Sequence, residues 1–240
     1  MAILNNPRSI VLSFLLGAAV ISQAAPTVYS GSDQGAGSAS PRPNSDAAAA
    51  AFDTAASSLG SVNVIDFESA PLGSFTNLVV APGVTINGSD YYSSPQTIRD
   101  LPFGTPDSLF GYNTTLGGDT FLGIYGGSVT FSFAPTVIAF GAYFSGLQVA
   151  SQTITYTSGS TETIYIPNLS SGIAFVGFTD ANASIASITV NSLNDIVGID
   201  DVRYVTDGNN RVPDATATLP LLGLAMAGLA VLRRRVQSRS

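Results

Sequence analysis

The sequence contains no cysteine, histidine, lysine or tryptophan. Without cysteine the protein has neither disulfide bonds nor thiolate metal sites. Without histidine it lacks both the commonest general base of enzymes and the commonest ligand of transition metals. Clustered oxygen ligands remain, and these suit hard cations such as Ca²⁺. A chain of 240 residues is long enough to bury a core without covalent cross-links.

Positive charge is scarce, and much of it lies at the C-terminus. All nine basic residues are Arg, and four of them stand among the last eight residues. Between residues 61 and 206, eleven acidic residues accompany only Arg99 and Arg203, so this stretch carries a net charge of −9. Such a surface repels phosphate backbones, and the sequence therefore predicts that nucleic acid is not a partner.

Residues 1–24 have the three parts of a secretory signal peptide. Arg8 precedes an apolar run over residues 10–21, which is too short to span a bilayer comfortably. The small residues Ser22 and Ala24 then occupy the positions that a signal peptidase reads before Ala25. We therefore expect export of the protein, the alternative being a retained N-terminal anchor.

The C-terminal residues predict a second hydrophobic segment. Residues 207–218 form a linker, and residues 219–235 form an apolar helix that ends in an Arg cluster. Its fourteen apolar residues, 219–232, fall below the ~20 of a stable transmembrane helix. The Arg cluster would hold this end on the cytoplasmic side, with the preceding domain outside the cell. The sequence thus predicts a transient or permanent membrane stop.

This tail resembles the PEP-CTERM class of bacterial sorting signals, in the variant that opens with Val-Pro-Asp. The resemblance rests on that opening motif, on the Leu/Gly/Ala-rich helix and on the terminal Arg run, and its residues are Val212, Pro213, Asp214, Arg233, Arg234 and Arg235. It implies that an exosortase-type membrane protease cleaves near the motif and passes the protein to the cell surface. An ordinary single-pass anchor gives nearly the same topology.

Between the two ends, composition divides the chain into a spacer and a β domain. Residues 25–60 are rich in Ser, Ala, Gly, Pro and Asp, which predicts a flexible spacer. Inside this spacer, the alanine-rich run that begins at Asp46 is compatible with a short helix.

Residues 61–206 are rich in Thr, Val, Ile, Phe and Tyr, with frequent turn residues and no helical periodicity. Gly126-Gly127 and Ser158–Ser160 are interpreted as hairpin turns. We expect an all-β fold, a jelly-roll-type β-sandwich flanked by the signal helix and the hydrophobic C-terminal helix. The clearest strands are expected over residues 120–125, 128–133, 136–144, 153–157, 161–166, 173–178, 184–190 and 197–204.

Two acidic motifs bracket the β domain: Phe67-Glu68 near its start and Asp200-Asp201 near its end. Because the first and last strands of a jelly roll commonly pair, these acids are expected to converge. The bracketing resembles jelly-roll carbohydrate-binding modules and related lectin-like domains. It implies that Glu68, with Asp200 or Asp201, holds a structural calcium ion. The alternative is that the two Asp residues only flank a terminal strand, with Arg203 as a surface ion-pair partner.

Tyrosines are the candidate sugar-binding aromatics, because tryptophan is absent. Tyr91 and Tyr92 lie in a loop rich in Gly, Ser, Asp and Pro, where an aromatic pair is seldom core. Tyr112 is a further candidate that the sequence leaves undecided. Tyr125 and Tyr143 are expected to fill the core.

The sequence holds no catalytic constellation, since His, Lys and a Gly-x-Ser-x-Gly elbow are all missing. It favours a non-enzymatic, exported protein of the extracellular matrix whose domain binds polysaccharide. One alternative is a secreted glycoside-acting enzyme with a carboxylate pair such as Glu68 and Asp100. The other is a structural matrix protein without a ligand.

Overall fold

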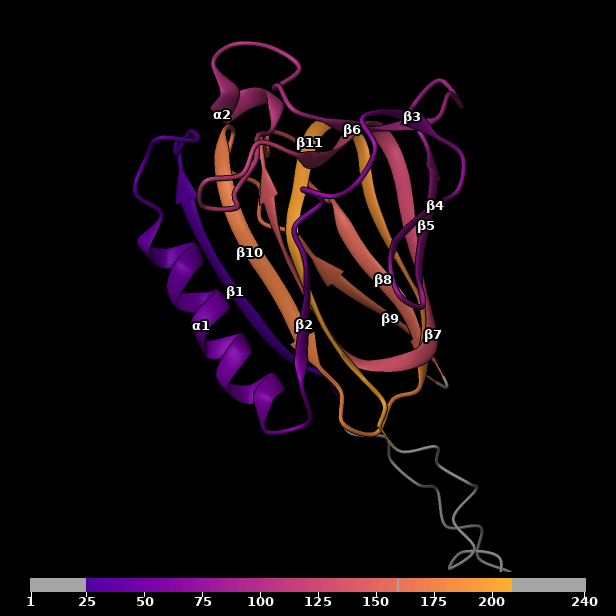
Figure 1. Cartoon of the computed structure of the whole chain (residues 1–240). Helices are drawn as coiled ribbons and strands as arrows, with labels where there is room; N and C mark the ends of the chain where they lie inside the picture. The colour runs from indigo at the N-terminus through magenta and orange to yellow at the C-terminus, as the bar shows by residue number, and fades with distance from the viewer. Residues whose placement is uncertain (1–24, 159, 209–240) are drawn as a thin grey trace, which may run out of the picture.

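The structure is a computed structural model that describes residues 25–158 and 160–208. These residues form mainly strands, joined in one curled antiparallel sheet (Figure 1), so the prediction of an all-β fold is confirmed. No helix in this part of the chain is long and apolar enough to cross a membrane. The predicted signal peptide, hydrophobic tail and sorting motif, with Val212, Pro213, Asp214 and the Arg run, lie outside the described residues.

Eleven strands and two helices are described, and the prediction of strands holds through most of the chain from residue 62 to 206. In chain order they are β1 (Thr27–Gln34), α1 (Pro43–Ser57), β2 (Val62–Ile65), β3 (Gly73–Phe75), β4 (Leu78–Ala81), β5 (Val84–Ser89), β6 (Gln96–Arg99), α2 (Asp107–Phe110), β7 (Phe121–Ser145), β8 (Thr153–Ser158), β9 (Ser160–Tyr165), β10 (Gly172–Thr179) and β11 (Ile185–Thr206).

The two longest strands, β7 and β11, run through both halves of the sheet. The start of β7 pairs with β5 and β6, and its end pairs with β10. The start of β11 pairs with β8, and its end pairs with β2. β7 and β11 also pair with each other, with Val190 opposite Val129 and Val197 opposite Ile124, which is the register of antiparallel strands.

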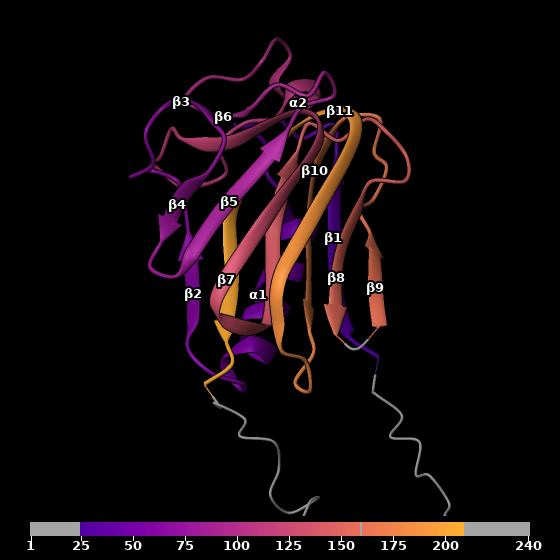
Figure 2. The ribbon, with the colours of Figure 1, turned by 90° about the vertical axis from the view of Figure 1, so that its right-hand side faces the viewer.

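One half of the sheet holds the starts of β7 and β11 with β5, β6 and β8, and the other half holds their ends with β10 and β2. These two halves face each other across the main core. Tyr156 on β8 stacks on Phe178 of β10 with ring centroids 4.3 Å apart, although these strands are not neighbours in the sheet. Phe131 and Phe140, from the first and second halves of β7, are in ring contact at 5.5 Å. Figure 2 shows β5, β7, β11 and β8 in front, with α1 and β1 behind them. Large apolar side chains from both halves are therefore buried in one core, and this burial is the main source of stability in such a fold.

The interpretation of residues 25–60 as a flexible spacer is wrong. β1 pairs with β10 over its whole length, and α1 packs on β1 and β10 (Figure 1). Phe52 of α1 is fully buried between Tyr29 and Phe175. The composition misled because small residues allow close packing: a Cβ on Gly31 would lie 2.1 Å from the carbonyl oxygen of Asn44. One large apolar side chain is enough to attach this helix when its neighbours are Ala and Gly.

The start of α1 is held by a carboxylate of β1. Asp33 accepts hydrogen bonds from the backbone N–H groups of Asn44 and Ser45 and from the Ser45 hydroxyl. Burial alone would raise the pKa of Asp33, but these hydrogen bonds outweigh it and lower the pKa below its ordinary value. The side chain thus satisfies N–H groups that a helix leaves unpaired at its first turn.

The predicted hairpin at Gly126-Gly127 is also wrong, because β7 continues through both residues. Both glycines have positive φ, 69° and 71°, without reversing the chain. They permit a close approach instead: a Cβ on Gly127 would lie 2.2 Å from the carbonyl oxygen of Ser89, and one on Gly126 would lie 2.9 Å from Cβ of Tyr91. The pair is therefore a contact site for the loop after β5. The second predicted hairpin is confirmed by the pairing of β8 with β9.

Candidate functional site

Three tyrosines from two segments gather around a hollow of ≈ 240 Å³ on the surface, which we name the tyrosine hollow. Tyr91 and Tyr92 come from the loop after β5, Tyr125 comes from β7, and Asn194 and Ile196 of β11 complete the lining. The tyrosines are 62%, 71% and 42% exposed, respectively. Tyr92 lies edge-to-face with Tyr91 at 5.3 Å and stacks with Tyr125 at 6.4 Å. The prediction that Tyr125 fills the core is wrong.

The loop that carries the tyrosines is held rigidly by its own hydrogen bonds. One Asp90 carboxylate oxygen accepts the backbone N–H groups of Tyr92 at 2.8 Å and of Ser94 at 2.7 Å. The N–H of Tyr91 donates to the carbonyl oxygen of Tyr125 at 3.1 Å, which ties the loop to β7. A ligand that binds here therefore meets rings that are already ordered, which reduces the entropy lost on binding.

A buried glutamine fastens the loop to β7 from beneath. Gln96 is 1% exposed, and its amide nitrogen donates to the carbonyl oxygens of Ser89 at 2.9 Å and Gly126 at 2.8 Å. Its amide oxygen accepts the N–H of Tyr125 at 3.1 Å. Because Gln96 itself is buried, its amide would lack partners without these three hydrogen bonds. Sequence reasoning missed Gln96 because a single polar residue within a strand gives no signal of its contacts.

The aromatic surface continues beyond the hollow through Phe103, whose ring contacts Tyr125 at 5.7 Å. The Arg99 guanidinium lies 3.9 Å from the centre of the Phe103 ring and donates to the carbonyl oxygen of Leu101. These contacts fix the segment from Arg99 to Phe103 against the start of β7.

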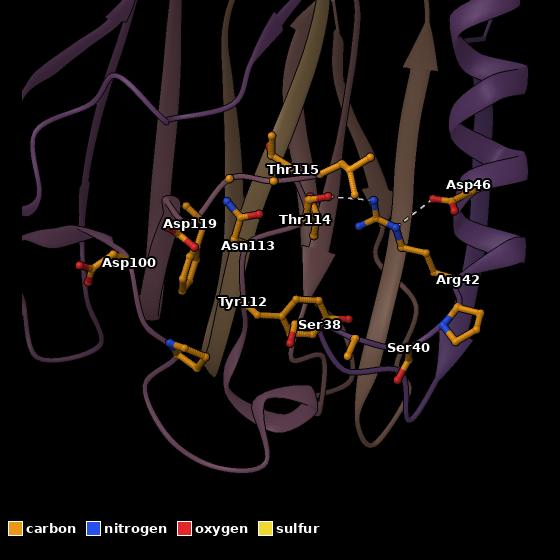
Figure 3. Close-up of a pocket in the computed structure, with 17 residues that line it drawn as sticks. Ser38, Ser40, Arg42, Asp46, Asp100, Tyr112, Asn113, Thr114, Thr115 and Asp119 are labelled. Carbon is orange, nitrogen blue, oxygen red and sulfur yellow. Dashed lines mark hydrogen bonds and ion pairs between the residues drawn. The ribbon is translucent and has the colours of Figure 1, made fainter.

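Asp100 and Pro102 of that segment line a second, larger cavity of ≈ 560 Å³ (Figure 3), which we name the loop cavity. Residues 38–42, residues 112–119 and Phe121 line it, together with Asp46, Asp100 and Pro102. Arg42 forms an ion pair with Asp46 at 3.0 Å and donates to the carbonyl oxygen of Thr114 at 2.8 Å.

Asp200 anchors one end of the loop that walls this cavity. The residue is fully buried, and one of its carboxylate oxygens accepts the N–H groups of Thr114 at 2.7 Å and Thr115 at 3.1 Å. The neighbouring Asp201 accepts the hydroxyls of the same two threonines. Burial raises the pKa of Asp200 to about 7, and the charge of Asp201 adds to this, while the backbone N–H groups oppose it.

Glu68 anchors the other end of this loop. Its carboxylate accepts the side-chain amide of Asn113 at 2.7 Å and the backbone N–H groups of Asp119 at 3.1 Å and Thr120 at 3.0 Å. β2 pairs with β11, with Ile65 opposite Val202, so the expected convergence of the first and last motifs is confirmed. They converge on one loop, which the sequence did not indicate.

The calcium site predicted from Glu68 with Asp200 or Asp201 stays a prediction, and in the structure these carboxylates contact N–H and O–H groups of one loop. Oε1 of Glu68 already accepts three N–H groups, whereas Oε2 accepts only one, so a cation would compete for the lone pairs of Oε1. Residues 25–158 and 160–208 contain no group of three acids placed to hold a metal ion. The alternative with Arg203 as an Asp200 or Asp201 ion-pair partner is wrong as well, because Arg203 forms its ion pair with Asp53.

Melting experiments test this calcium prediction separately from the hydrogen bonding of Glu68. Glu68→Gln is expected to lower the melting temperature equally in calcium and in EDTA, because the lost contacts are N–H hydrogen bonds. A loss confined to the calcium sample would contradict this assignment. For the unmodified protein, equal melting temperatures in calcium and EDTA would reject a native-state calcium site.

Tyr112 lines the loop cavity, but its side chain is almost completely covered. It is 3% exposed and packs in the cluster beneath α1, and its hydroxyl donates to the carbonyl oxygen of Ala36 at 2.9 Å. Burial, followed by the charge of Asp107, raises the pKa of this hydroxyl well above its ordinary value. Because Tyr112 lines the loop cavity, its assignment as a ligand-binding residue stays a prediction, whereas Tyr143 is buried as expected.

The carboxylate pair of the enzymatic alternative is not brought together in either hollow. Asp100 lines the loop cavity, but Glu68 is not among its lining residues and is bound to the N–H groups of the loop.

No family model matches the chain, and no curated protein matches it.

Proposed function

We propose that this chain is an exported, surface-held, non-enzymatic protein whose jelly-roll-type domain binds polysaccharide. In this proposal the signal peptide directs export, and an exosortase-type protease processes the C-terminal tail at the membrane. The observation that carries the binding function is the tyrosine hollow, in which Tyr91, Tyr92 and Tyr125 present ordered rings to solvent.

The chemistry of the hollow suits a sugar ring. A pyranose has apolar C–H faces, which pack on aromatic rings, and hydroxyl groups at its edges, which need hydrogen-bond partners. Tyr92 and Tyr125 offer ring surface, and the exposed Asn194 offers an amide with both donors and an acceptor. The volume of ≈ 240 Å³ lies below the ~300–1,000 Å³ of sites for drug-sized ligands, so the hollow receives one ring rather than a whole oligomer.

Charge and composition support the non-enzymatic part of the proposal. Residues 25–208 contain fifteen acids and three Arg residues, a net charge of −12. This charge disfavours polyanions, and the absence of His and Lys removes the usual general bases and nucleophile activators. Binding without turnover requires only the ordered aromatic surface and its polar rim.

Tyr92→Ala and Tyr125→Ala are each expected to weaken binding to a neutral soluble polysaccharide by about tenfold, since loss of a stacking ring costs roughly 1–3 kcal/mol. Affinity electrophoresis in gels that contain glucan, mannan, xylan or the exopolysaccharide of the producing cell measures the change. Tyr165→Ala is the matched control, because Tyr165 is 69% exposed on β9 and lies outside the hollow. Equal retention of all three variants, or no retention of the unmodified protein, would overturn the proposal.

A further inference from the structure

We infer that the tyrosine hollow and the loop cavity are the two ends of one binding surface for an extended, neutral polysaccharide chain. This inference rests on the proposed function and deepens it by naming the class of polymer. It follows from the way one short segment of chain borders both hollows, and from the charges that line the larger of them.

The bordering segment runs from Arg99 to Phe103. Asp100 and Pro102 line the loop cavity, and Phe103 contacts Tyr125 at the rim of the tyrosine hollow. A few consecutive positions of the chain thus pass from one hollow to the other. A ligand that extends out of the tyrosine hollow along this segment meets Phe103 first and the loop cavity next.

The floor beneath this path is the start of β7. Phe121 lines the loop cavity and Tyr125 lines the tyrosine hollow, and residues four apart on a strand share a face at a spacing of about 13 Å. Gly123 lies between them, and a Cβ there would stand 2.9 Å from the Phe103 ring and 2.5 Å from Cδ of Arg99. Because Gly123 has no side chain, the Phe103 ring packs directly on the strand between Phe121 and Tyr125.

The loop cavity selects against negative charge. Asp100 and Asp119 are exposed in its lining, and neither carboxylate accepts a hydrogen bond in the described structure. Arg42 is the cation among the lining residues, and Asp46 and the carbonyl oxygen of Thr114 already occupy its guanidinium. A uronate or sulfate therefore meets two free carboxylates and a single Arg that is already paired with a carboxylate, whereas a neutral sugar donates its hydroxyls to those carboxylates.

The wall of the cavity is ordered before any ligand arrives. Asp200 holds Thr114 and Thr115, and Glu68 holds Asp119 and Thr120, so both ends of the loop are fixed. Leu116 stands fully exposed at the tip between these anchors. An exposed leucine on a fixed loop offers apolar surface for the C–H face of a second sugar ring.

Isothermal calorimetry of the full chain with neutral glucan, mannan or xylan oligosaccharides of two and six units tests the inference, with uronate oligosaccharides of equal length in parallel. Affinity for one neutral series is expected to rise at least tenfold from two units to six. Leu116→Ala and Asp100→Ala are expected to weaken binding of the six-unit ligand several-fold and to leave the two-unit ligand unchanged. Tyr92→Ala weakens both, and Tyr165→Ala weakens neither.

The outcomes separate the inference from the proposed function. Equal affinity for two and six units, or no effect of Leu116→Ala and Asp100→Ala, would overturn the extended surface while Tyr92→Ala still reports binding in the hollow. Uronate oligomers that bind as tightly as neutral ones would overturn the charge selection. Failure of every oligosaccharide and of every polysaccharide gel would overturn the proposed function itself.

Discussion

Gly127→Ala is expected to destabilise the protein by about 3–5 kcal/mol, one of the two largest effects that we predict. An alanine with φ of 71° costs about 1–2 kcal/mol in the left-handed region. Its Cβ would also lie 2.2 Å from the carbonyl oxygen of Ser89, so the backbone before the tyrosine loop must move. That movement strains the hydrogen bond from Gln96 to Ser89, and the loss of a buried contact adds to the cost.

Urea unfolding monitored by circular dichroism measures this loss of stability. Gly35→Ala is the matched control, since Gly35 has a φ of 75° and a Cβ at that position would meet no other atom within 4 Å. The control carries only the backbone cost and is expected to lose about 1–2 kcal/mol. If the two variants are equally stable, the close approach of the tyrosine loop to β7 does not exist in solution.

Stability is expected to fall by about 4 kcal/mol as the pH rises from 4 to 8, mainly through Asp200. Its pKa is raised from 3.8 to about 7 in the folded protein, so the folded state holds the proton that the unfolded state releases. The contribution of Asp200 is therefore full below pH 3.8 and is lost as the pH passes through 7. Burial raises the pKa of Asp195 as well, which adds with the same sign.

Asp33 and Asp107 do not alter this dependence of the unfolding free energy on pH between pH 4 and 8. Their pKa values are lowered in the folded protein, so their contributions are present above pH 3.8 and are lost only in stronger acid. The window between pH 4 and 8 therefore isolates groups whose pKa values are raised, of which Asp200 is the most deeply buried.

In Asp200→Asn the unfolding free energy is expected to depend less on pH, because an amide does not ionise. The amide nitrogen would face the N–H of Asp201, which Asp200 now accepts at 2.8 Å, so a cost of about 1–3 kcal/mol at every pH is expected. The decisive measurement is thus the change of unfolding free energy with pH rather than its value at one pH. An unchanged dependence of the unfolding free energy on pH in Asp200→Asn would refute the assignment.

The parts of the fold that the sequence predicts correctly are those encoded by alternating apolar and polar residues and by turn residues. β8 and β9 follow from alternating Thr, Ile and Tyr. The convergence of Glu68 with the Asp200-Asp201 pair follows from the pairing of β2, the first strand of the predicted β domain, with the last strand, β11. For α1 the sequence indicates no more than a compatible segment, since its burial rests on Phe52 and on small residues that give no amphipathic pattern. The predicted hairpin at Gly126-Gly127 was wrong because glycines with positive φ occur where two backbone segments approach closely as well as where the chain reverses.

The predictable part of the site is the tyrosine pair of the loop after β5. Tyr91 and Tyr92 stand among turn residues, and that context correctly indicates exposure. Tyr125 looks identical to a core residue in sequence, because only the three-dimensional course of β7 decides which face of the strand is covered. Tyr112 and Gln96 depend on partners far along the chain, with which no local pattern associates them.

The pairing of early strands with late ones also determines when this molecule can fold. β1 has its partner at Gly172–Thr179, and β2 has its partner near residues 202–205. A chain that emerges from its N-terminus onward leaves both strands without hydrogen-bonding partners until almost all of the domain has appeared. Such long-range topology makes folding slow and places its decisive step after synthesis rather than during it.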